Sequence, residues 1–93
     1  MRSPLPIISI FMNIIIRINF RDHAPPHLHA EFKGLEGLFA IQTGACIAGG
    51  LPRKQHRLVR RWIDENREAL MRNWNLAYDR QPTFKMSGLD DDD

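Results

Sequence analysis

Apolar and polar residues alternate along the first half of the chain, which is typical of β-strands with one buried face. The residues from Ile7 onward are β-branched and aromatic, and from Ile14 to Phe20 every second residue is apolar. A second alternating run follows, and two shorter apolar segments come after it. The pattern predicts about four strands, over residues 7–21, 27–33, 35–42 and 45–48, with turns at Gly34, Thr43-Gly44 and Gly49-Gly50.

The spacing of apolar residues changes after Pro52 to the period of an amphipathic helix. Asn66 interrupts this pattern, and asparagine is a residue type that caps helix N-termini. Pro82 ends the helical region. We therefore expect two helices with a break at Asn66 and a shared buried stripe, which consists of Leu58, Val59, Trp62, Ile63, Leu70, Trp74, Ala77 and Tyr78.

Strands followed by helices indicate an α+β fold, in which two C-terminal helices pack on one face of a small antiparallel sheet. We expect a single domain over residues 6–82, with flexible termini over residues 1–5 and 83–93. The opposite face of the sheet would then be open to solvent or to a partner.

The chain has 93 residues, of which 43% are hydrophobic. This size fits one small domain and excludes a large multi-step enzyme with its own cofactor domain. Cys46 is the single cysteine, so no intramolecular disulfide can form and a reducing cytoplasm is expected. The apolar stretch over residues 5–16 is shorter than the ~20 residues that span a bilayer. We therefore expect a cytoplasmic protein that does not use a membrane.

The net charge of +2 conceals an uneven distribution of charge. Asp90–Asp93 contribute four of the eleven acidic residues, so seven remain against 13 basic residues in the rest of the chain. Such a basic chain favours an anionic partner, most commonly nucleic acid. The first predicted helix would present either a solvated face or a phosphate-binding face, formed by Arg53, Lys54, Arg57, Arg60 and Arg61.

A polar site is predicted where the first two strands meet. If they pair as a hairpin through residues 22–26, side chains from both strands share the open sheet face, because cross-strand neighbours lie ~4.5–5.5 Å apart. The residues concerned are Arg17, Asn19 and Arg21 on one strand, His27, His29 and Glu31 on the other, and Asp22 and His23 at the rim.

The leading interpretation of this face is acid–base chemistry on an anionic substrate. His27 and His29 would act as general acid and base, and Arg17 and Arg21 would hold a phosphate. This set suits metal-independent cleavage of RNA, whose 2′-hydroxyl supplies the nucleophile, and it needs no cofactor.

Two other interpretations of the histidines remain. His23, His27 and His29, with Asp22 or Glu31, could bind zinc or non-haem iron, although the prolines between the histidines and the nearby arginines count against a cation. Alternatively, the histidines brace the turn through hydrogen bonds and perform no chemistry.

The segment from Phe20 to Ala30 closely resembles the Pro-Pro-His-x-His hallmark of a family of short bacterial proteins classed as a domain of unknown function. The resemblance extends to Thr43-Gly44 and to Asn73-Trp74, and it departs at Asn13, where glycine is expected. It also covers Pro6-Ile7-Ile8-Ser9, Ile14-Ile15-Ile16-Arg17 and Leu51-Pro52-Arg53. The resemblance implies a two-gene arrangement similar to a toxin–antitoxin pair, and it supplies no catalytic residue.

We therefore expect a toxin-like protein that acts on RNA, with a small cognate protein encoded nearby as its partner. A non-enzymatic protein-binding module of such a pair, either antitoxin or regulator, is the alternative. A metal-binding protein is the third interpretation. Homo- and hetero-oligomers are both left open.

Overall fold

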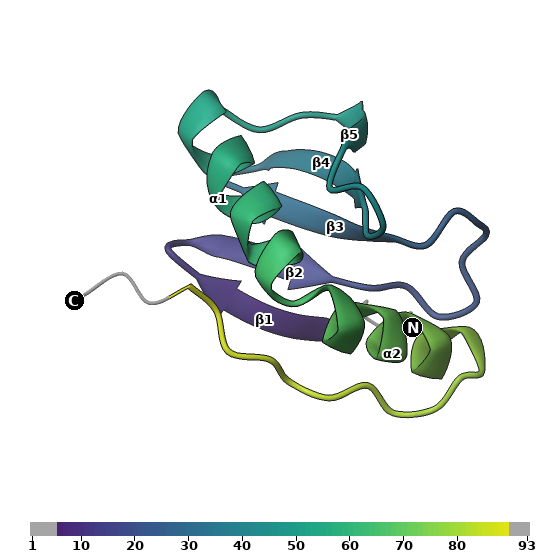
Figure 1. Ribbon diagram of the computed structural model, residues 1–93. Coiled ribbons are helices and arrows are strands. Elements are labelled where there is room, and N and C mark those ends of the chain that lie inside the picture. Colours follow the sequence, from purple (N-terminus) through teal and green to yellow (C-terminus); the bar gives the residue numbers. More distant parts are fainter. Residues whose placement is uncertain (1–5, 90–93) are drawn as a thin grey trace.

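The computed structural model describes residues 6–89, and the expected tails over residues 1–5 and 90–93 lie outside this range. Five strands form an antiparallel meander, and two helices follow them (Figure 1). The strands are β1 (Ile7–Phe11), β2 (Ile14–Arg17), β3 (His27–Phe32), β4 (Leu35–Ala40) and β5 (Cys46–Gly49), and the helices are α1 (Arg53–Glu65) and α2 (Arg67–Tyr78). The α+β prediction is confirmed.

The fifth strand arises because a tight turn divides the first predicted strand. Met12 and Asn13 both have positive φ angles, of 51° and 65°, between β1 and β2. Two-residue hairpin turns use such angles, and asparagine tolerates them better than most residues. Asn13 therefore occupies a position where glycine would also be suitable.

The core lies between one face of the sheet and the helices. Ile16, Leu28 and Phe39 from the strands are fully buried together with Trp62 and Leu70 from the helices. α1 crosses the sheet in Figure 1, and α2 lies beside the connection between β2 and β3, where the Ala77 carbonyl accepts a hydrogen bond from the Arg21 N–H at 3.1 Å. The prediction that both tryptophans are core residues is confirmed, since Trp74 is only 6% exposed.

Two aromatic residues expected in the apolar stripes are at the surface instead. Phe20 is 44% exposed, because β2 ends at Arg17 and the chain then turns. Tyr78 is 45% exposed at the last position of α2. The alternating pattern of apolar residues therefore continues to Phe20, three residues beyond the end of β2 at Arg17.

The predicted helix break at Asn66 is confirmed, but its mechanism differs from a side-chain cap. Asn66 donates its Nδ2 hydrogen bond backward to the Trp62 carbonyl at 2.8 Å. No side-chain cap bond forms at the start of α2. Asn66 thus satisfies a carbonyl of the helix that ends, rather than an N–H of the helix that begins.

Residues 84–89 were expected in a flexible terminus, but they pack along β1 (Figure 1). The Met86 N–H donates to the Ile8 carbonyl at 2.7 Å, and the Trp62 indole donates to the Ser87 carbonyl at 2.8 Å. Asn73 is fully buried and forms two 2.9 Å hydrogen bonds with the backbone of Phe84. The ordered core therefore extends beyond the predicted boundary at residue 82.

No helix in residues 6–89 has the length and apolar character needed to cross a membrane.

Candidate functional site

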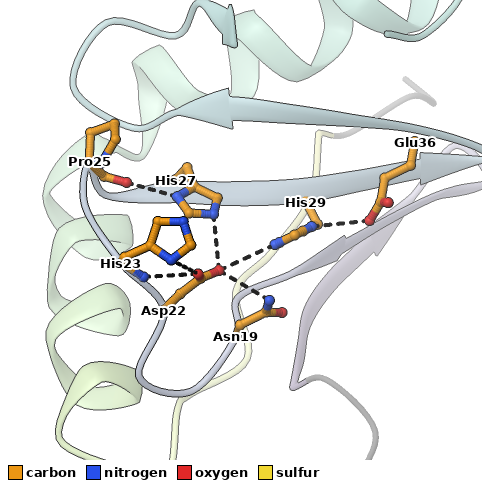
Figure 2. A network of polar contacts seen from close by, with 7 residues as sticks. All are labelled: Asn19, Asp22, His23, Pro25, His27, His29 and Glu36. Atoms are coloured by element: carbon orange, nitrogen blue, oxygen red, sulfur yellow. Dashed lines mark hydrogen bonds and ion pairs between the residues drawn. The ribbon is translucent and has the colours of Figure 1, made fainter. Parts of the chain in front are cut away.

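The connection between β2 and β3 carries Asp22 to the centre of a polar cluster (Figure 2). Its Oδ1 accepts the backbone N–H of His23 at 2.9 Å, and its Oδ2 accepts the Nδ2–H of Asn19 at 3.1 Å. The Asp22 side chain is 12% exposed. These two hydrogen bonds fix the carboxylate of Asp22 in one orientation.

His27 and His29 approach the same carboxylate from β3. They lie two residues apart, so their side chains leave the same face of the strand. The Nε2 atoms of His27 and His29 lie 3.0 Å and 3.6 Å from Asp22 Oδ2. One ligand atom from each of the three residues lies within 4.8 Å of the others.

The second nitrogen of each imidazole faces an acceptor on the protein. His27 Nδ1 lies 2.7 Å from the Pro25 carbonyl oxygen, and His29 Nδ1 lies 3.1 Å from Glu36 Oε2. Carbonyl and carboxylate oxygens only accept hydrogen bonds, so both Nδ1 atoms carry a proton. We therefore infer that the two Nε2 atoms are the ones available to bind a cation, either a proton or a metal ion.

The environment keeps Asp22 ionised. Burial acts to raise the pKa of its carboxyl, but the His23 N–H and the imidazoles of His27, His29 and His23 outweigh burial, so the pKa of Asp22 lies below its ordinary value of 3.8. The centre therefore contains a carboxylate at neutral pH.

His27 is buried, whereas a side chain on an open sheet face would be exposed to solvent. The residue is 4% exposed, and its ring packs against Trp74 with the ring centroids 5.4 Å apart. The expectation of a fully open face is therefore wrong at this end of β3, because α2 covers it. His23, in contrast, has a side chain that is 93% exposed at the edge of the cluster.

Arg17 and Arg21 were expected to hold a phosphate beside the histidines, but both contact other groups of the protein. Arg17 is opposite His29 in the register, but its Nη1 forms an ion pair with Glu31 Oε1 at 2.6 Å. The Arg21 guanidinium lies 4.8 Å from the centre of the Tyr78 ring and donates to the Tyr78 carbonyl at 3.3 Å. Both arginines thus have protein partners.

Glu36 and Trp74 belong to the cluster, although sequence reasoning did not assign them to it. A signal for Glu36 was present, since His29 pairs with Leu38 and the residue two positions before Leu38 is its diagonal neighbour on the same face. Trp74 contacts His27 only through the placement of α2, which residue spacing along the chain does not reveal.

The predicted cationic residues of α1 are exposed, as expected for either a solvated or a phosphate-binding face. Arg61 pairs with Glu65 at 3.2 Å, whereas within residues 6–89 the other four have no carboxylate within 4.0 Å. A surface hollow of about 620 Å³ adjoins this face. Its lining consists of Lys54, His56, Arg57, Leu58, Arg60, Arg61 and Asp64.

The fold and the cluster define a small α+β protein with an aspartate–histidine centre at one end of its sheet. The family described as Domain of unknown function (DUF4160) matches residues 13–75, which is more than half of the chain, and the chain belongs to this family. No curated protein and no solved structure matches it.

Proposed function

We propose that this domain acts on RNA as the toxin-like component of a two-gene module in the cytoplasm, with a small cognate protein as its partner. One observation carries the proposal: Arg53, Lys54, Arg57 and Arg60 project from α1 without a carboxylate partner in the described residues. An uncompensated cationic face of this kind attracts a polyanion.

The position of these cations within α1 strengthens the argument. Arg53 and Lys54 lie in the first turn, which contains no acidic residue. Positive charge is unfavourable there, because a helix N-terminus already carries a partial positive charge. α2 also begins with a cation, Arg67, but it has Glu68 in its first turn. We therefore ascribe the cations of α1 to phosphate binding and not to helix stability.

The histidine cluster is the proposed site of any catalytic step. His27 and His29 are the candidate acid and base, but both turn Nε2 inward to Asp22, and His29 Nε2 is buried. Cleavage would require at least one imidazole to leave Asp22 for the substrate. Binding of RNA does not require this rearrangement, so binding and cleavage are separable properties.

Expression in a bacterial host without the cognate protein tests the proposal. We expect growth arrest with the natural chain and recovery when Arg53, Arg57 and Arg60 are changed together to glutamine. A matched variant changes three exposed cations elsewhere, Arg72, Arg80 and Lys85, and keeps the same net charge. Arrest by this control but not by the α1 variant supports the proposal. Normal growth with the natural chain would contradict it.

A non-enzymatic protein-binding module is the second candidate, and the sheet edges favour it. Ile10 on edge strand β1 is 61% exposed, and Ile47 on edge strand β5 is 47% exposed. Edge strands have backbone groups that can add a strand from another chain, although on β1 the Ile8 carbonyl already accepts the Met86 N–H. Loss of partner binding in Ile10→Lys or Ile47→Lys, without growth arrest by any form of the chain, would favour this candidate over an RNA-directed toxin.

A further inference from the structure

We propose that Asp22, His27 and His29 bind one divalent transition-metal ion of the zinc or ferrous-iron class. The inference goes beyond the RNA proposal and does not depend on it. It rests on the protonation pattern, the spacing of the three ligand atoms, the rigidity of their supports and the local charge.

If both imidazoles are neutral, the hydrogen bonds leave electrostatic repulsion at the centre of the cluster. Both Nδ1 atoms donate to fixed acceptors, so each neutral imidazole directs a lone pair from Nε2 toward the carboxylate of Asp22. Lone pairs of two acceptors repel unless a cation lies between them. A second proton on the imidazole would remove this repulsion at His27, where the Nε2–Oδ2 distance of 3.0 Å allows a hydrogen bond.

A second proton on His29 would not form a comparable hydrogen bond with Asp22. Its Nε2 lies 3.6 Å from Asp22 Oδ2, which is too long for a hydrogen bond, and the atom is buried with no other partner in the described chain. Buried polar nitrogens without partners are uncommon in folded proteins. One metal ion bound by all three residues would satisfy this atom together with His27 and Asp22.

The spacing suits such an ion. Metal–ligand bonds of ~2.0–2.1 Å in a tetrahedral arrangement place the ligand atoms ~3.3 Å apart. The two Nε2–Oδ2 distances, 3.0 Å and 3.6 Å, lie on either side of this value. The ligand atoms of the two histidines lie within 4.8 Å of each other, so binding of the ion would draw the two imidazoles closer together.

Each ligand is already held by a second residue. Pro25 and Glu36 orient the two imidazoles, and the His23 N–H together with Asn19 orients Asp22. A carbonyl or carboxylate behind a metal-binding histidine is the usual arrangement in metalloproteins, because it fixes the tautomer and increases the basicity of the ligand. Figure 2 shows these outer contacts around the three ligands.

The charge distribution also favours a cation. Nearby arginines were expected to repel a metal ion, but Arg17 is neutralised by Glu31 at 2.6 Å and Arg21 contacts Tyr78. Asp22 and Glu36 remain as negative charges beside the imidazoles. Two histidines and one carboxylate leave coordination positions open to water or to an exogenous ligand.

The ligand set differs from the one that the sequence suggested. The structure assigns the carboxylate ligand to Asp22, because Glu31 is paired with Arg17. It also leaves His23 outside the set, because its side chain is 93% exposed and its Nδ1 lies 3.4 Å from the other carboxylate oxygen, Asp22 Oδ1.

The test is titration of the chelator-treated full chain with zinc, and then with cobalt as a spectroscopic probe. We expect one ion per chain and visible Co(II) bands of nitrogen and oxygen coordination. His29→Ala should lower the affinity by more than the ~10–100-fold that loss of an outer partner costs, and Glu36→Gln should lower it within that range. Circular dichroism establishes that each variant is folded. Because Glu36 is an exposed residue, its variant remains informative if a ligand variant unfolds.

His56→Ala, on α1 and outside the cluster, is the control. It should bind the ions as the natural chain does. Absence of stoichiometric binding by the natural chain would overturn the proposal, as would an equal loss of affinity in the His56 control and the His29 variant. No RNA is present in these titrations, so failure of the metal site and failure of the RNA proposal give different results.

Discussion

Arg17 and Glu31 form a cross-strand ion pair in which Nη1 and Oε1 are 2.6 Å apart. Glu31 pairs with Ile15 in the register, so the guanidinium reaches diagonally along the sheet face. Glu31 therefore already binds Arg17, the cation that was expected to hold a phosphate. A phosphate at Arg17 would first have to displace a carboxylate that already binds there.

A double-mutant cycle on Arg17→Ala and Glu31→Ala measures the strength of this pair. We expect a coupling free energy of about 0.2–1 kcal/mol, since both side chains are partly solvated. RNA affinity should change no more in Arg17→Ala than in the Arg72→Ala control. A loss of RNA affinity confined to Arg17→Ala would return this residue to a phosphate-binding role.

The sequence predicted the architecture because strands and helices leave periodic patterns that need no knowledge of tertiary structure. The turn at Met12-Asn13 was missed because methionine is an unusual residue at a positive φ angle. Asp22, His27 and His29 do lie close together, as the expected pairing of the strands implied, and their role as a functional site stays a prediction. Its chemistry was harder to predict, because Glu36, Trp74 and the Arg17–Glu31 pair depend on register and on the position of α2.

The ionisation of Asp22 predicts a specific acid dependence of stability. Because the folded-state pKa of Asp22 is lowered from its ordinary value of 3.8, its contribution to stability is present above that value and is lost as the pH falls through the folded-state pKa. The groups that face it are Asn19, which is neutral, and His23, His27 and His29.

Chemical denaturation of the metal-free chain and of Asp22→Asn between about pH 5 and about pH 2.5 tests this dependence. The natural chain should be the more stable at the upper end, and the difference in unfolding free energy should shrink toward the lower end. A difference that is constant over the whole range would mean that the Asp22 charge does not stabilise the fold.

Replacement of His27 should destabilise the protein. His27→Ala removes a buried ring that packs on Trp74 and leaves Asp22 without one of its partners, so we expect a loss of about 1–3 kcal/mol. For a domain of this size each kcal/mol lowers Tm by roughly 4–8 °C. His23→Ala is the control, with an expected change under about 0.5 kcal/mol because that side chain is exposed. Equal melting temperatures for the two variants would show that His27 does not brace the turn.

Asn73 should anchor the C-terminal segment to α2. Its side chain is fully buried and both accepts from and donates to the backbone of Phe84, so Asn73→Ala should cost about 1–3 kcal/mol. Hydrogen exchange at the Phe84 and Met86 amides should accelerate at the same time. Asn75→Ala, on the exposed side of the same helix, should change neither property. Unchanged exchange at Phe84 in the Asn73 variant would show that the segment is held by other contacts.

The α1 face predicts a quantitative salt dependence of RNA binding. Each phosphate contact with a single strand contributes about −0.7 to the slope of log affinity against log salt concentration. Changing Arg53, Arg57 and Arg60 to glutamine should therefore weaken binding and flatten the slope by about 2. Stability should remain within about 0.5 kcal/mol of the natural chain, because these side chains are exposed.

The measurement is fluorescence anisotropy with a labelled single-stranded RNA over a salt series. The variant with Arg72, Arg80 and Lys85 changed to glutamine has the same net charge, and it should retain the natural slope. If both variants flatten the slope equally, the attraction is a general effect of net charge and α1 is not the RNA-binding face.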